Sequence, residues 1–195
     1  MNYRKKCLLF GLFVAVLSLG VAQARAQTPT QQIQQTLQQV TTVVTRAPGS
    51  SAVERRKALH DALVPRFDFF EMAKRSLGKH WNTIPDRQEE FVAVFAEFLG
   101  NSYIGKISSY KDEKILFVRE SMDKELAEVD TQVVPSKGEP LSVNYRLHRV
   151  GGEWKIYDVV VENISLVTNY RSQFNRIITR GSFDDLLKRM KEKEL

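Results

Sequence analysis

Residues 141–161, LSVNYRLHRVGGEWKIYDVVV, decide the fold of this chain. In the first half of this stretch, apolar residues at odd positions alternate with polar ones, which is typical of a strand with one buried face. Gly151-Gly152 then follows, and two consecutive glycines suit the positive φ angles of a two-residue hairpin turn. The sequence therefore predicts antiparallel strands at 141–150 and 153–161.

Two further strands are predicted upstream of this hairpin. Residues 114–119 and 126–134 are rich in β-branched and aromatic side chains. The segment 135–140 has a proline at each end and reads as a longer turn. Because all the connections are short, the four strands are expected to form an antiparallel meander.

The segments before and after the sheet carry apolar residues at helical spacing. Ser51, Asp68 and Ser165 are placed as N-caps, and Gly78 and Gly181 as terminators. The predicted helices are 30–45, 52–63, a short helix between Asp68 and Gly78, 87–110, 166–180 and 183–193. The fold class is therefore α+β, with N-terminal and C-terminal helices before and after a four-stranded antiparallel sheet.

Residues 1–26 have the features of a secretory signal peptide. A basic segment, 2–6, precedes an uncharged apolar run, Leu8 to Val21, and small residues follow at Ala22, Ala24 and Ala26. The run is shorter than the roughly 20 residues of a spanning helix, although an uncleaved anchor is the alternative. Residues 27–195 are then one domain, working outside the cytoplasm.

Removal of this segment changes the charge. The whole chain has 29 Lys and Arg against 23 Asp and Glu, a net charge of +6. Four of the basic residues and none of the acids lie in 1–26, so 27–195 carries 25 against 23, or +2. A nearly balanced domain does not point to nucleic acid as a partner. The single cysteine, Cys7, is also removed, which leaves no disulfide and no thiolate metal site.

No catalytic or cofactor-binding set can be assembled from the sequence. His60, His80 and His148 are far apart, and none has a second His or Cys at metal-ligand spacing. No phosphate-binding glycine loop is present. We therefore expect no catalytic residues, no metal and no cofactor, and the chain is not predicted to be an enzyme.

Aromatic residues gather in three blocks, at 67–81, 91–110 and 145–174. On periodicity alone such stripes are core. A long aromatic helix laid across a curved sheet can also leave an apolar space that suits an apolar ligand. The sequence leaves both interpretations open.

Two of these blocks resemble the toluene-tolerance (MlaC-like) family of periplasmic phospholipid-binding proteins. The first is 67–81, FDFFEMAKRSLGKHW, followed by Gln88 and aromatic positions along the next helix. The second runs through 143–146, 152–159 and 165–174, the last being SLVTNYRSQF. One departure is Asn163, where the family usually has glycine; asparagine tolerates left-handed backbone better than most residues.

The resemblance implies a monomeric carrier that moves glycerophospholipid between an outer-membrane lipoprotein–porin complex and an inner-membrane ABC transporter complex. In this family the acyl tails lie in a deep pocket between helices and sheet. Another lipid such as a hopanoid is an alternative cargo. Two competing hypotheses for the function are a periplasmic scaffold that binds no lipid and a lipid hydrolase.

The predicted lining of the pocket combines aromatic and aliphatic side chains from helices and sheet. Its members are Phe67, Met72, Leu77, Trp81, Phe95, Phe98, Leu99, Tyr103, Val143, Tyr145, Val159, Val161, Leu166, Tyr170 and Phe174. Asp158 and Arg171 are interpreted as structural, a charge pair or capping network that ties the last strand to the following helix.

Overall fold

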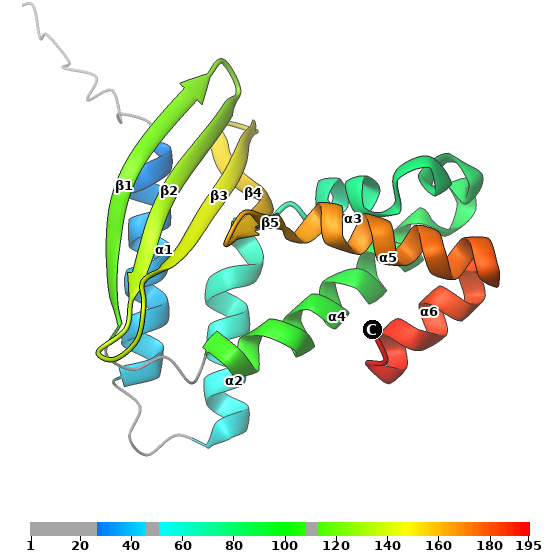
Figure 1. The fold of residues 1–195 in the computed structure, drawn as a ribbon, viewed down its shortest axis with the longest axis horizontal. Helices are drawn as coiled ribbons and strands as arrows, with labels where there is room; N and C mark the ends of the chain where they lie inside the picture. The colour runs from blue at the N-terminus through cyan, green and yellow to red at the C-terminus, as the bar shows by residue number, and fades with distance from the viewer. Residues whose placement is uncertain (1–26, 46–50, 108–112) are drawn as a thin grey trace, which may run out of the picture.

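The computed structural model describes residues 27–45, 51–107 and 113–195. The predicted signal peptide and the end of the helix predicted to reach Tyr110 lie outside these residues. The described chain folds into one antiparallel sheet and two groups of helices (Figure 1).

The sheet is a meander with its strands in sequence order. Gly151 and Gly152 have φ angles of 59° and 90° and form the predicted two-residue turn. The strands are β1 (Lys114–Asp123), β2 (Leu126–Val134), β3 (Leu141–Val150), β4 (Glu153–Val161) and β5 (Ile164–Ser165). The α+β class and the antiparallel order are confirmed, but the sheet has five strands where four were predicted.

The fifth strand was missed because it consists of two residues, too few to show any period. β1 also continues four residues beyond its predicted end at Arg119. The pairing of β1 with β2 shifts register between Phe117 and Arg119, which makes Val118 an extra residue. Such a bulge breaks the alternation of side chains on which the prediction relied.

Helix α1 (Pro29–Thr45) lies against the sheet and contacts β1 and β2 (Figure 1). Buried Gln32 fixes it to β4, because its side-chain amide donates to the Trp154 carbonyl and its carbonyl accepts from the Trp154 N–H. Helix α2 (Ala52–Leu63) packs on α1. The predicted cap Ser51 begins α2 in a reciprocal capping box with Glu54.

The other helices form a second group beside β4 (Figure 1). Asp68 and Ser165 cap their helices as predicted. The group consists of the short turns η1 (Val64–Arg66), η2 (Gly78–Thr83) and η3 (Pro85–Arg87) with α3 (Phe69–Leu77), α4 (Gln88–Ile107), α5 (Leu166–Arg180) and α6 (Phe183–Glu192). Asp158 of β4 joins the group to the sheet: it accepts from Ser165 Oγ at 2.7 Å and from the Val167 N–H at 3.1 Å.

Buried apolar side chains of the described residues form three clusters. The helix cluster joins α3, η2, α4, α5 and α6. The sheet cluster joins Ile33 of α1 to β2, β3 and β4. The third cluster is Val40, Leu59 and Ile104, from α1, α2 and α4. α1 and α4 therefore each contribute to two clusters, and they link the sheet to both groups of helices.

Candidate functional site

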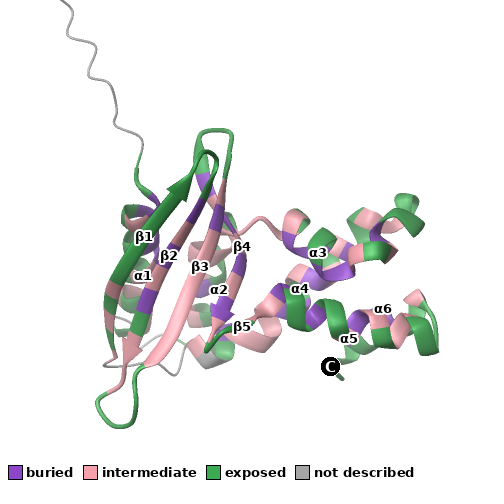
Figure 2. Ribbon diagram, turned by 45° about the horizontal axis from the view of Figure 1, so that its top comes forward, coloured by how far each residue is buried: buried purple, intermediate pink, exposed green. Residues whose placement is uncertain are grey.

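The four predicted sheet residues lie together on one face of the sheet. In the register of β3 with β4, Val143 pairs with Val161 and Tyr145 pairs with Val159. Paired residues in a sheet share a face, and positions two apart share it as well. All four side chains are half-buried. Figure 2 shows intermediate burial along most of β3. We call Val143, Tyr145, Val159 and Val161 the apolar floor.

Part of the apolar floor is covered by neighbouring segments. Tyr145 and Val159 pack against the sheet cluster together with Leu37 of α1 and with Phe67. Phe67 precedes α3, and it is held by a bridge to Ile156 of β4. The floor is therefore bordered by α1 on one side and by the start of the helix group on the other.

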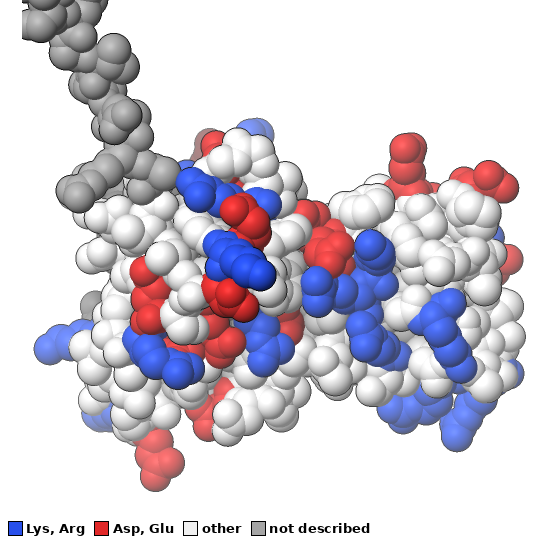
Figure 3. All heavy atoms as spheres, turned by 90° about the horizontal axis from the view of Figure 1, so that it is seen from above, with Lys and Arg blue, Asp and Glu red and all other residues white. Residues whose placement is uncertain are grey.

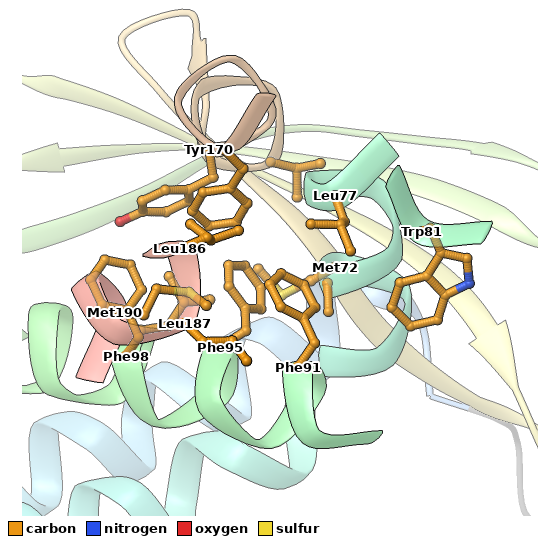
Figure 4. Packing of buried hydrophobic residues seen from close by; sticks show 14 residues of the cluster. Met72, Leu77, Trp81, Phe91, Phe95, Phe98, Tyr170, Leu186, Leu187 and Met190 are labelled. Atoms are coloured by element: carbon orange, nitrogen blue, oxygen red, sulfur yellow. The ribbon is translucent and has the colours of Figure 1, made fainter. Parts of the chain in front are cut away.

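The predicted helix residues occupy a different environment. Eight of them are buried members of the helix cluster: Met72, Leu77, Trp81, Phe95, Phe98, Leu99, Tyr170 and Phe174. Phe95 and Phe174 are 0% exposed, with ring centroids 5.9 Å apart. Figure 4 shows side chains of this cluster, from α3, α4, α5 and α6, directed toward one another. Most predicted helix residues thus pack on each other and do not present an open wall.

Three predicted residues lie at the borders of these two groups. Phe67 packs against both the helix cluster and the sheet cluster. Tyr103 of α4 is half-buried against the helix cluster. Leu166, the first residue of α5, is half-buried beside the end of β4. Of these three residues, Phe67 is the one that links the sheet cluster to the helix cluster.

A pair of tyrosine hydroxyl groups lies within this apolar surrounding. The hydroxyl oxygens of Tyr103 and Tyr170 are 3.2 Å apart, across α4 and α5. Burial raises the pKa of Tyr170 well above its usual range, and the hydrogen bond with Tyr103 adds to the shift. The Tyr170 hydroxyl therefore remains a neutral hydrogen-bonding group at ordinary pH.

Sequence reasoning missed several residues on the same face of the sheet. Val129 and Thr131 of β2 pair with Tyr145 and Val143 and are buried. The alternation of apolar and polar residues in 126–134 was a usable signal for them. Leu37 follows Ile33 at helical spacing, so its direction toward the sheet could also have been inferred.

Two hollows among the described residues are open surface grooves. One, of about 660 Å³, lies between α1 and α2 and is lined mainly by polar side chains such as Gln35 and Gln38. The other, of about 280 Å³, lies between α4 and α6 among ion-paired side chains such as Arg87 and Asp184. None of the fifteen predicted residues lines either groove.

Histidines in the described ranges have local partners. His148 Nε2 lies 2.9 Å from Asp68 Oδ2, and His80 Nε2 lies 3.0 Å from Asn175 Oδ1. The same ranges contain no group of three or more His, Cys, Asp or Glu side chains that could hold a metal ion. They also contain no helix with the length and apolar character needed to cross a bilayer.

The predicted network that ties the end of β4 to α5 includes Asp158 but not Arg171. Asp158 caps the start of α5, as described above, and accepts a further hydrogen bond from Arg146 at 3.2 Å. Arg171 is not part of this network. Its Nε donates to the Arg75 carbonyl at 2.7 Å and ties α5 to α3.

Comparison with known proteins identifies the family. The model of the MlaC protein family matches residues 31–192. The intermembrane phospholipid transport system binding protein MlaC of Haemophilus influenzae is 22% identical over 70% of this chain and 67% of that protein. The toluene tolerance protein ttg2D of Pseudomonas putida is 25% identical over 89% of this chain and 84% of that protein.

A solved structure shares the fold. A phospholipid-binding protein from Ralstonia solanacearum, determined in complex with a phospholipid, superposes with a TM-score of 0.73. The superposition covers 83% of this chain and 93% of the other, at 23% sequence identity. The family match extends over nearly all of the described residues and confirms the resemblance seen in the sequence. The chain belongs to the MlaC protein family.

Proposed function

We propose that this protein is a phospholipid-binding carrier of an intermembrane transport system, and that residues 1–26 direct its export to the periplasm. The observation that carries the proposal is the half-buried apolar floor on β3 and β4, within a chain of the MlaC family. The relative from Haemophilus influenzae is named for phospholipid transport between membranes. The structural neighbour was determined with a phospholipid bound.

In this proposal the acyl tails contact the apolar floor first. Val143, Val161 and Leu166 are half-buried, so a hydrocarbon chain laid on them would remove their remaining surface from water. The fully buried rings of Phe95 and Phe174 would lie beside the site, inside the helix cluster. They could touch a tail only after the helix cluster had separated, because neither ring is exposed.

The energetics of the cargo require such a surface. Two acyl chains contain about 30 methylenes, and at about 0.8 kcal/mol each their exposure to water costs roughly 24 kcal/mol. Escape of a lipid through water is therefore negligible, and a soluble carrier must replace the membrane with an equally apolar surface. Loading and unloading are then close to balance, and docked complexes at the two membranes decide the direction.

The partners proposed are those implied by the family resemblance: an outer-membrane lipoprotein–porin complex, an inner-membrane ABC transporter complex and a glycerophospholipid ligand. The sequence predicts no cofactor for this role. A carrier that exchanges between two such complexes is proposed to act as a monomer.

Native mass spectrometry of residues 27–195 after purification tests the proposal. We expect a complex whose extra mass equals a phospholipid; a mass matching a hopanoid would identify the alternative cargo. A protein that retains no lipid and extracts none from phospholipid vesicles would contradict the carrier and favour the scaffold. Release of free fatty acid from the vesicles would instead support the hydrolase.

A matched pair of valine substitutions tests the site. Val143→Glu places a charge on the apolar floor, and we expect it to remove most of the retained lipid. Val118→Glu makes the same change at a residue of β1 that is 61% exposed, and lipid retention should be unchanged. Equal retention in both variants would remove the floor from the site.

The buried rings are poor choices for this test. Phe98 and Tyr170 are 4% and 7% exposed. A glutamate there would bury a charge without a partner, which is strongly destabilising. Loss of lipid in such a variant would therefore report unfolding and not the lining of the site.

A further inference from the structure

Although the charge of residues 27–195 is nearly balanced, two stretches that lack acids carry several basic residues. Residues 72–85 and 163–183 contain no Asp or Glu. Between them they carry six basic residues: Lys74, Arg75, Lys79, Arg171, Arg176 and Arg180. Because residues 27–195 as a whole are nearly neutral, such a local excess matters only if the fold places the two stretches together.

The structure does place them side by side. The first stretch covers α3 and η2, the second covers α5, and the two helices are in extensive contact. Arg171 Nε donates to the Arg75 carbonyl at 2.7 Å, and His80 lies 3.0 Å from Asn175. Two segments about 90 positions apart in sequence therefore form one surface, which we call the basic face.

All six basic residues of this face are exposed. Figure 3 shows Lys and Arg gathered over the middle of the helix group, while in the sheet half they alternate with Asp and Glu. The nearest carboxylate in sequence is that of Glu71, which forms ion pairs with two of these residues. Its Oε1 lies 2.7 Å from Arg75 Nη2, and its Oε2 lies 3.9 Å from Lys74 Nζ. Lys79 and Arg176 form no ion pair with any other described residue, so their charges face solvent.

We propose that the basic face docks on a membrane surface rich in anionic phospholipid headgroups. The charges are spread along α5, whose 15 residues span about 22 Å, and this suits an extended negative surface better than a single small anion. Phe70 on α3 is 51% exposed and lies one helical turn before Lys74. An exposed ring beside cations is a combination found at membrane interfaces.

The proposal is independent of the lipid-carrying site. None of the six basic residues belongs to the apolar floor or to the buried rings of the helix cluster. Docking would bring the carrier to a membrane before it meets a transport complex there, and it would concentrate the protein where its cargo is exchanged. Binding at such a surface is electrostatic and must weaken as salt shortens the Debye length.

Flotation with vesicles tests the proposal. Residues 27–195 are mixed with vesicles of equimolar phosphatidylglycerol and phosphatidylcholine, or of phosphatidylcholine alone, and the bound fraction is measured. We expect binding to the anionic vesicles only. This binding should be lost between about 0.01 M and about 1 M salt, over which the Debye length falls from about 30 Å to about 3 Å.

A charge-reversed double variant and a matched control assign the binding to the face. Each basic residue near an anionic membrane strengthens binding about fivefold. Removal of two of them, in Lys79→Glu with Arg176→Glu, should therefore lower the partition coefficient at least about 25-fold. Lys124→Glu with Lys137→Glu makes the same charge change at exposed turns of the sheet, and it should cost less than about threefold. Circular dichroism of both variants should match the parent.

Several outcomes would overturn the proposal. They are equal binding to neutral vesicles, no binding to either kind, and equal losses in the two double variants. Unchanged vesicle binding of Lys79→Glu with Arg176→Glu, combined with lost capture of an acidic membrane protein, would assign the face to a protein partner instead. Lipid retained after purification is measured on the same samples. Its absence would contradict the carrier while leaving the membrane result to stand.

Discussion

Asn163 shows how one residue sets the path from the sheet to α5. Its φ angle is 63°, and the preceding Glu162 has a φ angle of 47°, so two consecutive residues adopt left-handed backbone. This conformation is costly for residues with a Cβ atom, and asparagine tolerates it better than most. The sequence predicted that asparagine could stand where the family usually has glycine, and the left-handed φ angle confirms it.

Substitution of Asn163 should change stability with a sign that depends on the new side chain. Asn163→Gly removes the strain, and we expect the free energy of unfolding to rise by up to about 1 kcal/mol. Asn163→Val should lower it by about 1–2 kcal/mol. Urea denaturation measures both. Asn169→Gly, at an exposed position of α5, is the control and should be destabilising by a few tenths of a kcal/mol.

Because burial raises the pKa of Tyr170, we expect the protein to lose stability in alkali. Below about pH 10 the folded and unfolded chains both keep the phenolic proton, so the pKa shift has no effect. Above about pH 10 the unfolded chain releases that proton while the folded chain retains it, because burial raises the pKa of Tyr170. The free energy of unfolding should then fall by about 1.4 kcal/mol for each pH unit.

Denaturation of the parent and of Tyr170→Phe at a series of pH values from about 8 to about 11 measures this contribution. Phenylalanine keeps the ring contacts with Phe98 and Phe174 but has no proton to lose. The variant should therefore show a shallower decline above about pH 10 than the parent does. Parallel curves would show that Tyr170 ionises as readily in the folded chain as in the unfolded one.

At the scale of elements, the sequence predicted a strand or helix correctly where both the spacing of its apolar residues and its end signals could be recognised. The bounds of β2, β3 and β4, and of α2 and α5, agree with the prediction, because alternation or helical spacing ran up to a recognisable turn or cap. The bulge at Val118 and the two-residue β5 gave no such signal.

The candidate site could be predicted only in part, for a related reason. Periodicity shows which side of an element is apolar, but not whether that side meets other side chains or a ligand. For Val143 and Val161 the apolar side is half-open, whereas for Phe95 and Phe174 it is filled by neighbouring rings. The cross-strand register and the packing of α3 to α6 decide this difference. The spacing of apolar residues within one segment predicts neither of them.

Gln32 is expected to hold α1 on the sheet through its hydrogen bonds with β4. Its side chain satisfies the backbone N–H and carbonyl of Trp154, and it is buried. Gln32→Ala would leave both groups without these partners, so we expect the free energy of unfolding to fall by about 1–3 kcal/mol. Gln34→Ala, at an exposed position of the same helix, should change it by less than about 0.5 kcal/mol. Equal effects of the two substitutions in urea denaturation would contradict this role of Gln32.

Across the whole molecule, the described interior is divided into three clusters, where small domains usually have one continuous core. α1 and α4 each serve two clusters, and Phe67 packs against two. A ligand seated on the apolar floor would contact the sheet cluster, and Phe67 would place it beside the helix cluster as well. The proposed carrier should therefore gain stability from its cargo in a way that a solid scaffold would not.

Removal of lipid should lower the melting temperature of the protein, and return of phospholipid should restore it. Ligand at about 100 times its dissociation constant stabilises the folded state by about 2.7 kcal/mol. Differential scanning fluorimetry of delipidated protein, with and without added phospholipid, measures the change. Val143→Glu serves as the unresponsive control. An unchanged melting temperature in the delipidated parent would mean that cargo and fold are not coupled.

The bulge in β1 has a consequence for how the protein survives at high concentration. β1 is the first strand of the sheet order, and its outer edge has no strand beside it among the described residues. Its exposed Leu116, Val118 and Met122 would suit fibril growth if the strand were flat. The extra residue at Val118 and the charges of Arg119 and Glu120 interrupt that template. A short irregularity in one strand thus works against the stacking of crowded copies of this chain into amyloid.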